Sequence, residues 1–135
     1  MIALGVLLLQ LAAPAGAPTV QPASPRTLSG RFACDATVYE VQVTATPVGG
    51  SGVVLDRLTI GGKPVDAGSL AEARRMTARL ADVQSLDVRC RSDSAGELSV
   101  YGMQAAAGAA PRRARLRGLL NGNSITGLVV AVEQR

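Results

Sequence analysis

The sequence has no histidine and no tryptophan, and its aromatic side chains are limited to one phenylalanine and two tyrosines. Without histidine, neither a Ser-His-Asp triad nor a Cys-His pair can form, since both use an imidazole as the general base. The scarcity of aromatic rings also argues against binding of single-stranded nucleic acid, which depends on bases stacking on such rings. We therefore expect neither a common nucleophilic enzyme nor a nucleic-acid-binding module.

Motifs that hold metals or nucleotides are also lacking. Gly61-Gly62-Lys63 does not have the spacing of a phosphate loop, and Pro64 stands where a serine or threonine is needed. Both cysteines are expected to be oxidised, so no motif predicts a zinc site. We expect no cofactor and no metal, and no catalytic residue is predicted. A hydrolase that uses two carboxylates stays open, because such a pair need only be close in space. Its default candidates are Asp35, Asp56 and Asp66.

The first residues are typical of an export signal. Residues 2–13 are apolar apart from Gln10, a run that fits a signal-peptide core and is short against the ~20 residues of a membrane-spanning helix. A proline ends the run, and the small residues around it predict cleavage after Ala15 or, less well, after Ala17. No lysine or arginine precedes the run. We expect residues 1–15 to be a signal peptide, rather than a buried helix or an uncleaved anchor, and the protein to be extracytoplasmic, either periplasmic or secreted.

The two cysteines, Cys34 and Cys90, lie beyond this signal. An even number of cysteines in an exported protein favours a disulfide. The bond would close a loop of about 57 residues and stabilise the fold by roughly 4 kcal/mol in the chain-entropy model. A redox-active thiol is the alternative, but the chain has no Cys-x-x-Cys motif and no histidine to lower a thiol pKa. We expect a structural disulfide.

Alternation of apolar and polar residues predicts several strands. In the first of them, Val41, Val43 and Ala45 are expected on one face. An Asn-Gly pair at Asn121 is a strong hairpin signal. The predicted strands cover residues 31–46, 53–60, 86–91, 97–103, 113–120 and 124–133, with a short return at 63–65 and a loop at 105–111.

One helix is predicted near residues 69–82. Ser69 and Glu72 have the spacing of a capping box, in which each side chain bonds the backbone of the other. Apolar residues follow at helical intervals, and the charged residues between them indicate a solvated face. We expect residues 16–29 to be a flexible lead-in and residues 30–135 to form a single disulfide-linked α+β domain. Its core would be a mostly antiparallel sheet of about six strands, with the helix packed on one face.

A run of arginines is the feature that most exceeds the background. Thirteen of the fourteen basic residues are arginines, and the formal net charge is +4. Strand periodicity puts Arg113, Arg115 and Arg117 on one face, about 6.6–6.8 Å apart. Guanidinium groups suit carboxylates and phosphates, although a strand face blunted by charge against aggregation would look the same. We interpret these three residues as a candidate anion-binding site.

The leading hypothesis is a small exported, non-enzymatic binding or accessory domain. Its basic strand face would contact an anionic lipid, an acidic glycan or an acidic protein partner, and the chain has no further apolar run long enough to span a membrane. The carboxylate-dependent hydrolase is one alternative. A structural or inhibitor subunit is the other, and it would expose an apolar patch of several hundred Å².

Overall fold

The computed structural model describes residues 24–46, 52–91, 95–106 and 108–133. The expected signal peptide, residues 1–15, and both expected cleavage points lie outside the described residues. The described residues form β1 (Arg26–Cys34), β2 (Thr37–Thr46), β3 (Gly52–Ile60), β4 (Lys63–Pro64), α1 (Ala67–Thr77), β5 (Asp82–Cys90), β6 (Gly96–Ala106), β7 (Ala109–Asn121) and β8 (Ser124–Val132). None of these elements is a helix of the length and apolarity needed to cross a membrane.

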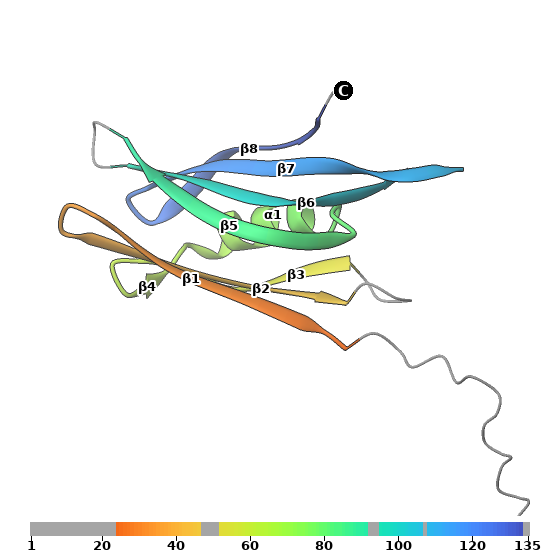
Figure 1. The fold of residues 1–135 in the computed structure, drawn as a ribbon. Helices are drawn as coiled ribbons and strands as arrows, with labels where there is room; N and C mark the ends of the chain where they lie inside the picture. The colour runs from red at the N-terminus through yellow and green to blue at the C-terminus, as the bar shows by residue number, and fades with distance from the viewer. Residues whose placement is uncertain (1–23, 47–51, 92–94, 107, 134–135) are drawn as a thin grey trace, which may run out of the picture.

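The strands form two sheets of four, and not one sheet of about six as predicted. The first sheet has the order β1-β2-β3-β4 and the second the order β5-β6-β7-β8, with every neighbouring pair antiparallel. Figure 1 shows the two sheets as stacked layers. The prediction of a mostly antiparallel α+β fold with one helix is confirmed. The single-sheet prediction was wrong because alternation marks which face of a strand is buried, but not which sheet the strand joins.

The predicted strand over 31–46 is a hairpin of two strands. Asp35 has a positive φ of 55° in the turn between β1 and β2, a conformation that aspartate tolerates better than most residues. β1 begins at Arg26, inside the range 16–29 that was expected as a lead-in. Within β2 the expected alternation holds, since Val41, Val43 and Ala45 are buried.

The helix starts and ends earlier than its predicted range of 69–82. Asp66 is the N-cap: one of its carboxylate oxygens accepts from the backbone N–H of Ser69 at 2.8 Å, and the other from the Ser69 hydroxyl at 3.0 Å. The predicted capping box is therefore wrong, and Glu72 instead pairs with Arg75. The helix ends at Thr77, and β5 begins only five residues later, at Asp82.

The core lies between the two sheets and under the helix. It is almost entirely aliphatic, and Tyr39 is its one fully buried aromatic residue among those described. The helix contributes Ala73 and Met76, and Leu80 follows directly after it. Dispersion and burial of aliphatic side chains therefore supply most of the cohesion.

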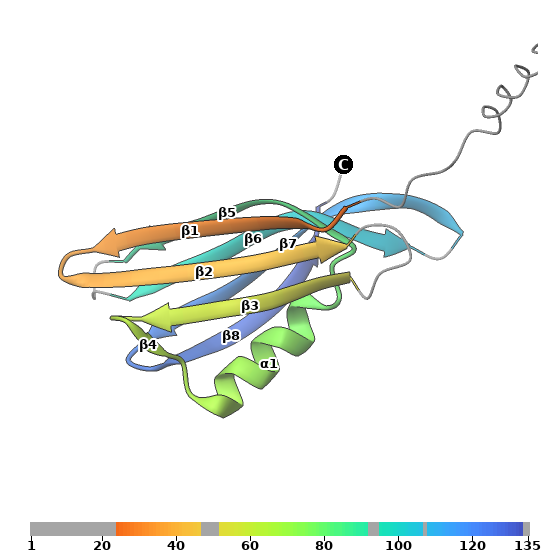
Figure 2. The ribbon, with the colours of Figure 1, turned by 90° about the horizontal axis from the view of Figure 1, so that it is seen from below.

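The expected Cys34–Cys90 disulfide is confirmed, with the two Cα atoms 5.4 Å apart. It joins the last residues of β1 and β5, which lie side by side as edge strands of the two sheets. Such a bond is compatible with an extracytoplasmic protein. The helix occupies the opposite side of the molecule, where it contacts β3 and β8 (Figure 2). We call these two junctions the disulfide seam (β1 and β5) and the helix seam (β3, α1 and β8).

At the other end of the chain the expected β7–β8 hairpin is confirmed. Gly122 has φ 66° in its turn, as a tight turn requires. The predicted loop over 105–111 is largely strand, because β6 runs to Ala106 and β7 begins at Ala109. β8 is less buried than expected: Ile125 is in the core, whereas Val129 is exposed.

Candidate anion-binding face

The predicted arginine row lies on the outer face of the second sheet. Along β7 the intervening residues Ala114 and Leu116 are buried, while Arg113 and Arg117 are exposed and Arg115 is half-buried. The structure therefore places all three guanidinium groups on the side away from the core. The strand forms this way because its apolar residues recur with period two and the arginines fill the alternate positions.

The three arginines have different surroundings. The guanidinium of Arg115 lies over the ring of Tyr101, 5.6 Å from its centroid, which is the geometry of a cation–π contact. Arg117 lies 3.8 Å from Glu97, at the long end of ion-pair distances, and its side chain is 47% exposed. Arg113 has no ion pair within the described residues. The face thus has one arginine held over a ring, one loosely paired and one open to solvent.

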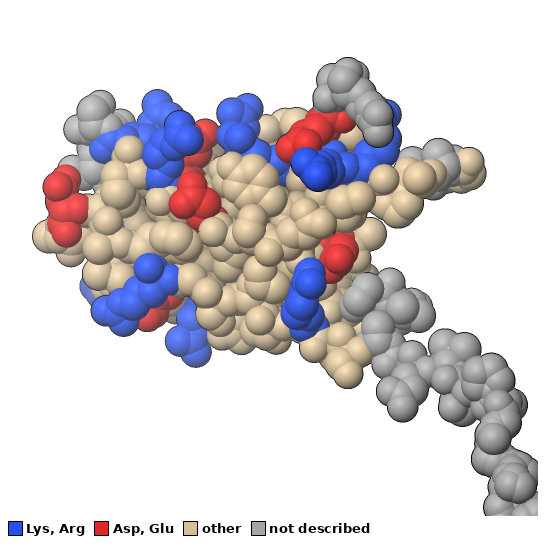
Figure 3. All heavy atoms as spheres, in the orientation of Figure 1, with Lys and Arg blue, Asp and Glu red and all other residues tan. Residues whose placement is uncertain are grey.

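The charge of this face is mixed rather than purely basic. β6 separates β5 from β7, so Asp87 and Arg89 of β5 are not direct neighbours of the arginine row. Arg89 lies opposite Glu97 in the β5–β6 register, and Glu97 also faces Arg117. Basic and acidic side chains accordingly intermix over the second sheet, at the top of Figure 3. The interleaved carboxylates reduce the repulsion among guanidinium groups.

A shallow depression of about 240 Å³ lies between β7 and β8. It is lined by Arg115 and Arg117 from β7, by Ala131 and Val132 from β8, and by Glu133 directly after β8. Ala131 stands directly opposite Arg115, and its small side chain leaves room above the sheet. Two guanidinium groups at the side of an open depression can bind an anion, while the nearby Glu133 carboxylate would compete with it.

The candidate carboxylates of a hydrolase occupy three separate settings. Asp35 is in the β1–β2 turn, Asp56 accepts a hydrogen bond from Thr44 in the first sheet, and Asp66 caps the helix. The Ser69 backbone N–H, and secondly its hydroxyl, hold the pKa of Asp66 below its ordinary value of 3.8. Asp56 and Asp66 therefore have structural partners, and Asp35 lies in a turn, so the structure does not bring the three carboxylates together.

Other kinds of site find no support in the part of the chain that the structure describes. No group of three or more cysteines and acids is placed to hold a metal ion there. Exposed large apolar side chains in the same ranges are Val54 and Val129, which lie on the outer faces of different sheets. The chain matches no protein-family model, no curated protein and no solved structure. What the protein does must therefore be argued from its surface.

The sequence interpretation missed a second depression, on the outer face of the first sheet. It measures about 270 Å³, and its polar lining comes from β1, β2 and β3. Alternation correctly placed Glu40 and Gln42 outward on β2, but it could not show which residues of β1 and β3 stand beside them. That information is carried by the strand register, which local sequence patterns do not specify.

Proposed function

We propose that the protein is a small exported, non-enzymatic domain that binds an anionic partner through the outer face of β7. The observation that carries the proposal is the outward row of Arg113, Arg115 and Arg117, whose one ion pair among the described residues is the 3.8 Å contact of Arg117 with Glu97. Arginine is suited to this role because its planar fork matches carboxylate and phosphate oxygens.

The geometry favours a partner with repeated negative charge over a single small anion. The three arginines repeat at about 6.6–6.8 Å along an extended strand, and the adjoining depression is shallow and open. An extended row contacts an anionic lipid surface, a glycan chain or the acidic face of a protein at several points at once. Each point adds a small electrostatic contribution, and the sum is sensitive to salt.

The proposal is tested with the purified oxidised protein and three probes: vesicles rich in phosphatidylglycerol, dextran sulfate, and poly-glutamate. We expect binding to one or more of them that weakens as the salt concentration rises. The triple variant Arg113→Gln, Arg115→Gln, Arg117→Gln should then bind vesicles roughly a hundredfold more weakly, since each basic residue near an anionic surface contributes about 1 kcal/mol.

A matched control removes the same charge elsewhere. Lys63, Arg75 and Arg79 are exposed and lie on β4, on α1 and just after it. Their triple glutamine variant lowers the net charge equally and should bind like the unmodified protein. The β7 row is not a binding face if the native protein binds none of the three probes. Equal losses of binding in the two triple variants would lead to the same conclusion.

A further inference from the structure

The outer face of the first sheet is built from three cross-strand rows of polar residues. In the first row Thr27 bonds Thr44 at 3.0 Å, and the Thr44 hydroxyl donates to Asp56 at 2.5 Å. In the third row Arg31 and Thr59 both donate to the Glu40 carboxylate, each at 3.2 Å. These two rows are closed by their own hydrogen bonds.

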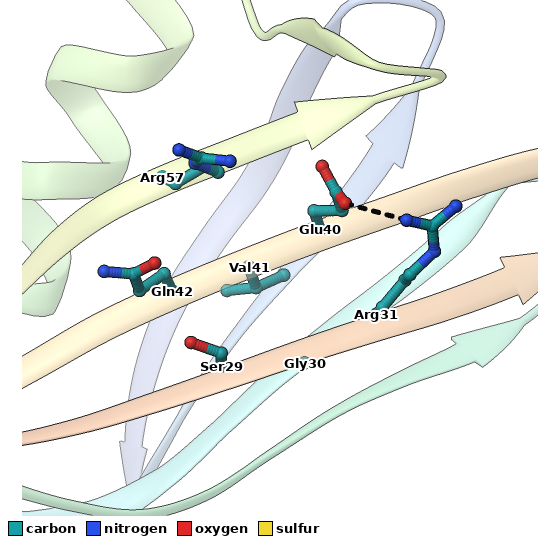
Figure 4. Close-up of a pocket in the computed structure, with 7 residues that line it drawn as sticks. All are labelled: Ser29, Gly30, Arg31, Glu40, Val41, Gln42 and Arg57. Atoms are coloured by element: carbon teal, nitrogen blue, oxygen red, sulfur yellow. Dashed lines mark hydrogen bonds and ion pairs between the residues drawn. The ribbon is translucent and has the colours of Figure 1, made fainter.

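The middle row differs from both. It consists of Ser29, Gln42 and Arg57, which stand opposite one another in the register of β1, β2 and β3. No side-chain hydrogen bond joins any of the three to another described residue, and all three line the depression of about 270 Å³. Figure 4 shows the contrast among the residues that it draws: a dashed line links Arg31 to Glu40, and none reaches Ser29, Gln42 or Arg57. A hydroxyl, an amide and a guanidinium group are thus available in one depression.

An irregularity in β3 explains why Arg57 stays unpaired. The register shifts between Gln42 and Val43, which leaves Asp56 as an extra residue without an opposite on β2. The helix fixes this bulge, because Arg74 donates to the backbone oxygens of Leu55 at 2.9 Å and of Asp56 at 3.5 Å. The Asp56 carboxylate is held by Thr44 instead of Arg57. Bulges of this kind re-aim side chains and occur often beside functional sites.

The available groups define the chemistry of a ligand. Glu40 is occupied by two donors, so the depression has one cation without a carboxylate, Arg57. A guanidinium fork binds a carboxylate through two parallel hydrogen bonds. Gln42 and Ser29 can each donate and accept, as a ligand hydroxyl also does. Adjacent strands lie about 4.8 Å apart, so the row spans about 10 Å.

We infer that the middle row is a binding site for a hydroxylated carboxylate of the size of one sugar-acid residue, such as a uronate. The carboxylate pairs with Arg57, and the ring hydroxyls pair with Gln42 and Ser29. No aromatic residue stands on this face among the described positions of β1 to β3. A neutral sugar would lack both a stacking platform and a charge to bind, so the carboxylate is required. The site lies on the opposite sheet from the β7 arginines and does not depend on them.

The test is a nuclear magnetic resonance titration of the oxidised protein with D-glucuronate, D-glucose and acetate in parallel. We expect glucuronate to shift the backbone amides near Ser29, Gln42 and Arg57 with millimolar affinity, because the depression is shallow. Glucose and acetate should each bind at least tenfold more weakly, since each supplies one half of the contacts.

Variants separate recognition from general charge. Arg57→Gln should weaken glucuronate binding at least tenfold, and Arg57→Lys should also weaken it, because lysine keeps the charge but loses the fork. Arg75→Gln removes an equal charge on the helix and should leave binding unchanged. Dispersed amide spectra of each variant verify folding. Equal shifts with acetate or glucose, full binding by Arg57→Gln, or shifts confined to residues 113–117 would each overturn the inference.

Discussion

The two seams of the molecule join the same pair of sheets by different means. At the disulfide seam, the Cys34–Cys90 bond links β1 and β5 covalently at one end. At the other end an ion pair joins them, with Arg26 of β1 lying 3.1 Å from Asp82 of β5. Arg26 also donates to the backbone oxygen of Val83. Direct links between the two edge strands therefore lie at both ends of this seam.

The helix seam contains an entire element between its strands. A backbone hydrogen bond joins the start of α1 to the turn between β7 and β8: the Asp66 N–H donates to the Asn123 oxygen at 2.8 Å. Ser69 accepts from the Ile125 N–H at 3.2 Å, and Arg74 donates to Leu55 of β3. Met76 of the same helix is buried in the core. The helix seam is therefore held by a packed helix and its hydrogen bonds, whereas the disulfide seam is held by a covalent bond and an ion pair.

The two seams are expected to lose stability in different ways. A covalent link acts mainly by limiting the unfolded chain, so breaking it costs little native packing. A packed helix contributes through contacts in the folded state, so its loss is distributed over many side chains. Changes at the two seams should therefore differ in size, in pH dependence and in sensitivity to reductant.

The largest effect is expected from removing the disulfide. Cys34→Ala combined with Cys90→Ser should lower the free energy of unfolding by about 4 kcal/mol, because a loop of more than fifty residues is no longer closed in the unfolded state. Urea denaturation followed by circular dichroism measures the change. Dithiothreitol should destabilise the native protein to a similar extent and leave the variant unaffected. A native protein indifferent to reductant would contradict the assigned role of the bond.

The next largest effect is expected at the helix seam. Met76 is 7% exposed and part of the core, so Met76→Ala should cost about 3 kcal/mol through lost burial and a residual cavity. Arg75→Ala, on the exposed side of the same helix, should change the free energy of unfolding by no more than about 0.5 kcal/mol. Because the seams lie on opposite sides, the Met76→Ala loss should be equal in oxidised and reduced protein. Similar losses in the two variants would mean that the helix does not seal the core.

These expectations rest partly on features that the sequence made visible. The even number of cysteines predicts the disulfide, and period-two alternation predicts that Val41 and Val43 are buried. The split of residues 31–46 into β1 and β2 does not follow from such patterns, because the turn at Asp35 contains neither glycine nor proline. Nor does the division into two sheets, because alternation marks the buried face of a strand but not the sheet that the strand joins. The helix cap was misplaced by three residues because Asp66 and Ser69 are both good N-caps. The backbone hydrogen bond from Asp66 to Asn123, which accompanies the observed cap, joins residues far apart in the sequence.

Of the two candidate sites, one can be predicted from the sequence and the other cannot. Three alternating arginines on one strand can be found in the sequence, since a single strand determines their common face. The middle row of Ser29, Gln42 and Arg57 cannot, because it depends on the register of three strands and on a bulge. Local sequence fixes neither. Cross-strand sites therefore require the structure, whereas within-strand sites do not.

A smaller, pH-dependent effect is expected at the helix cap. The Ser69 N–H and hydroxyl hold the pKa of Asp66 below 3.8. The stabilisation by this carboxylate is therefore complete above its unfolded-state pKa and is lost as the pH falls through its folded value. Asp66→Asn keeps a capping acceptor but cannot titrate. Its melting temperature should lie a few degrees below that of the native protein at pH 7, and the gap should close below about pH 4. A gap that does not change with pH would exclude the charged cap.

The smallest effect is expected from Arg26→Ala in the oxidised protein. The Arg26 side chain is 54% exposed, and exposed ion pairs contribute roughly 0.2–1 kcal/mol. With Cys34–Cys90 intact, β1 and β5 stay tethered, so the loss should be near the lower limit. In the Cys34→Ala, Cys90→Ser background, the contacts of Arg26 with Asp82 and Val83 are the side-chain polar links that remain between these edges among the described residues, and the same substitution should cost more. A double-mutant cycle from urea denaturation measures this coupling. Strict additivity would show that the two ends of the disulfide seam act independently.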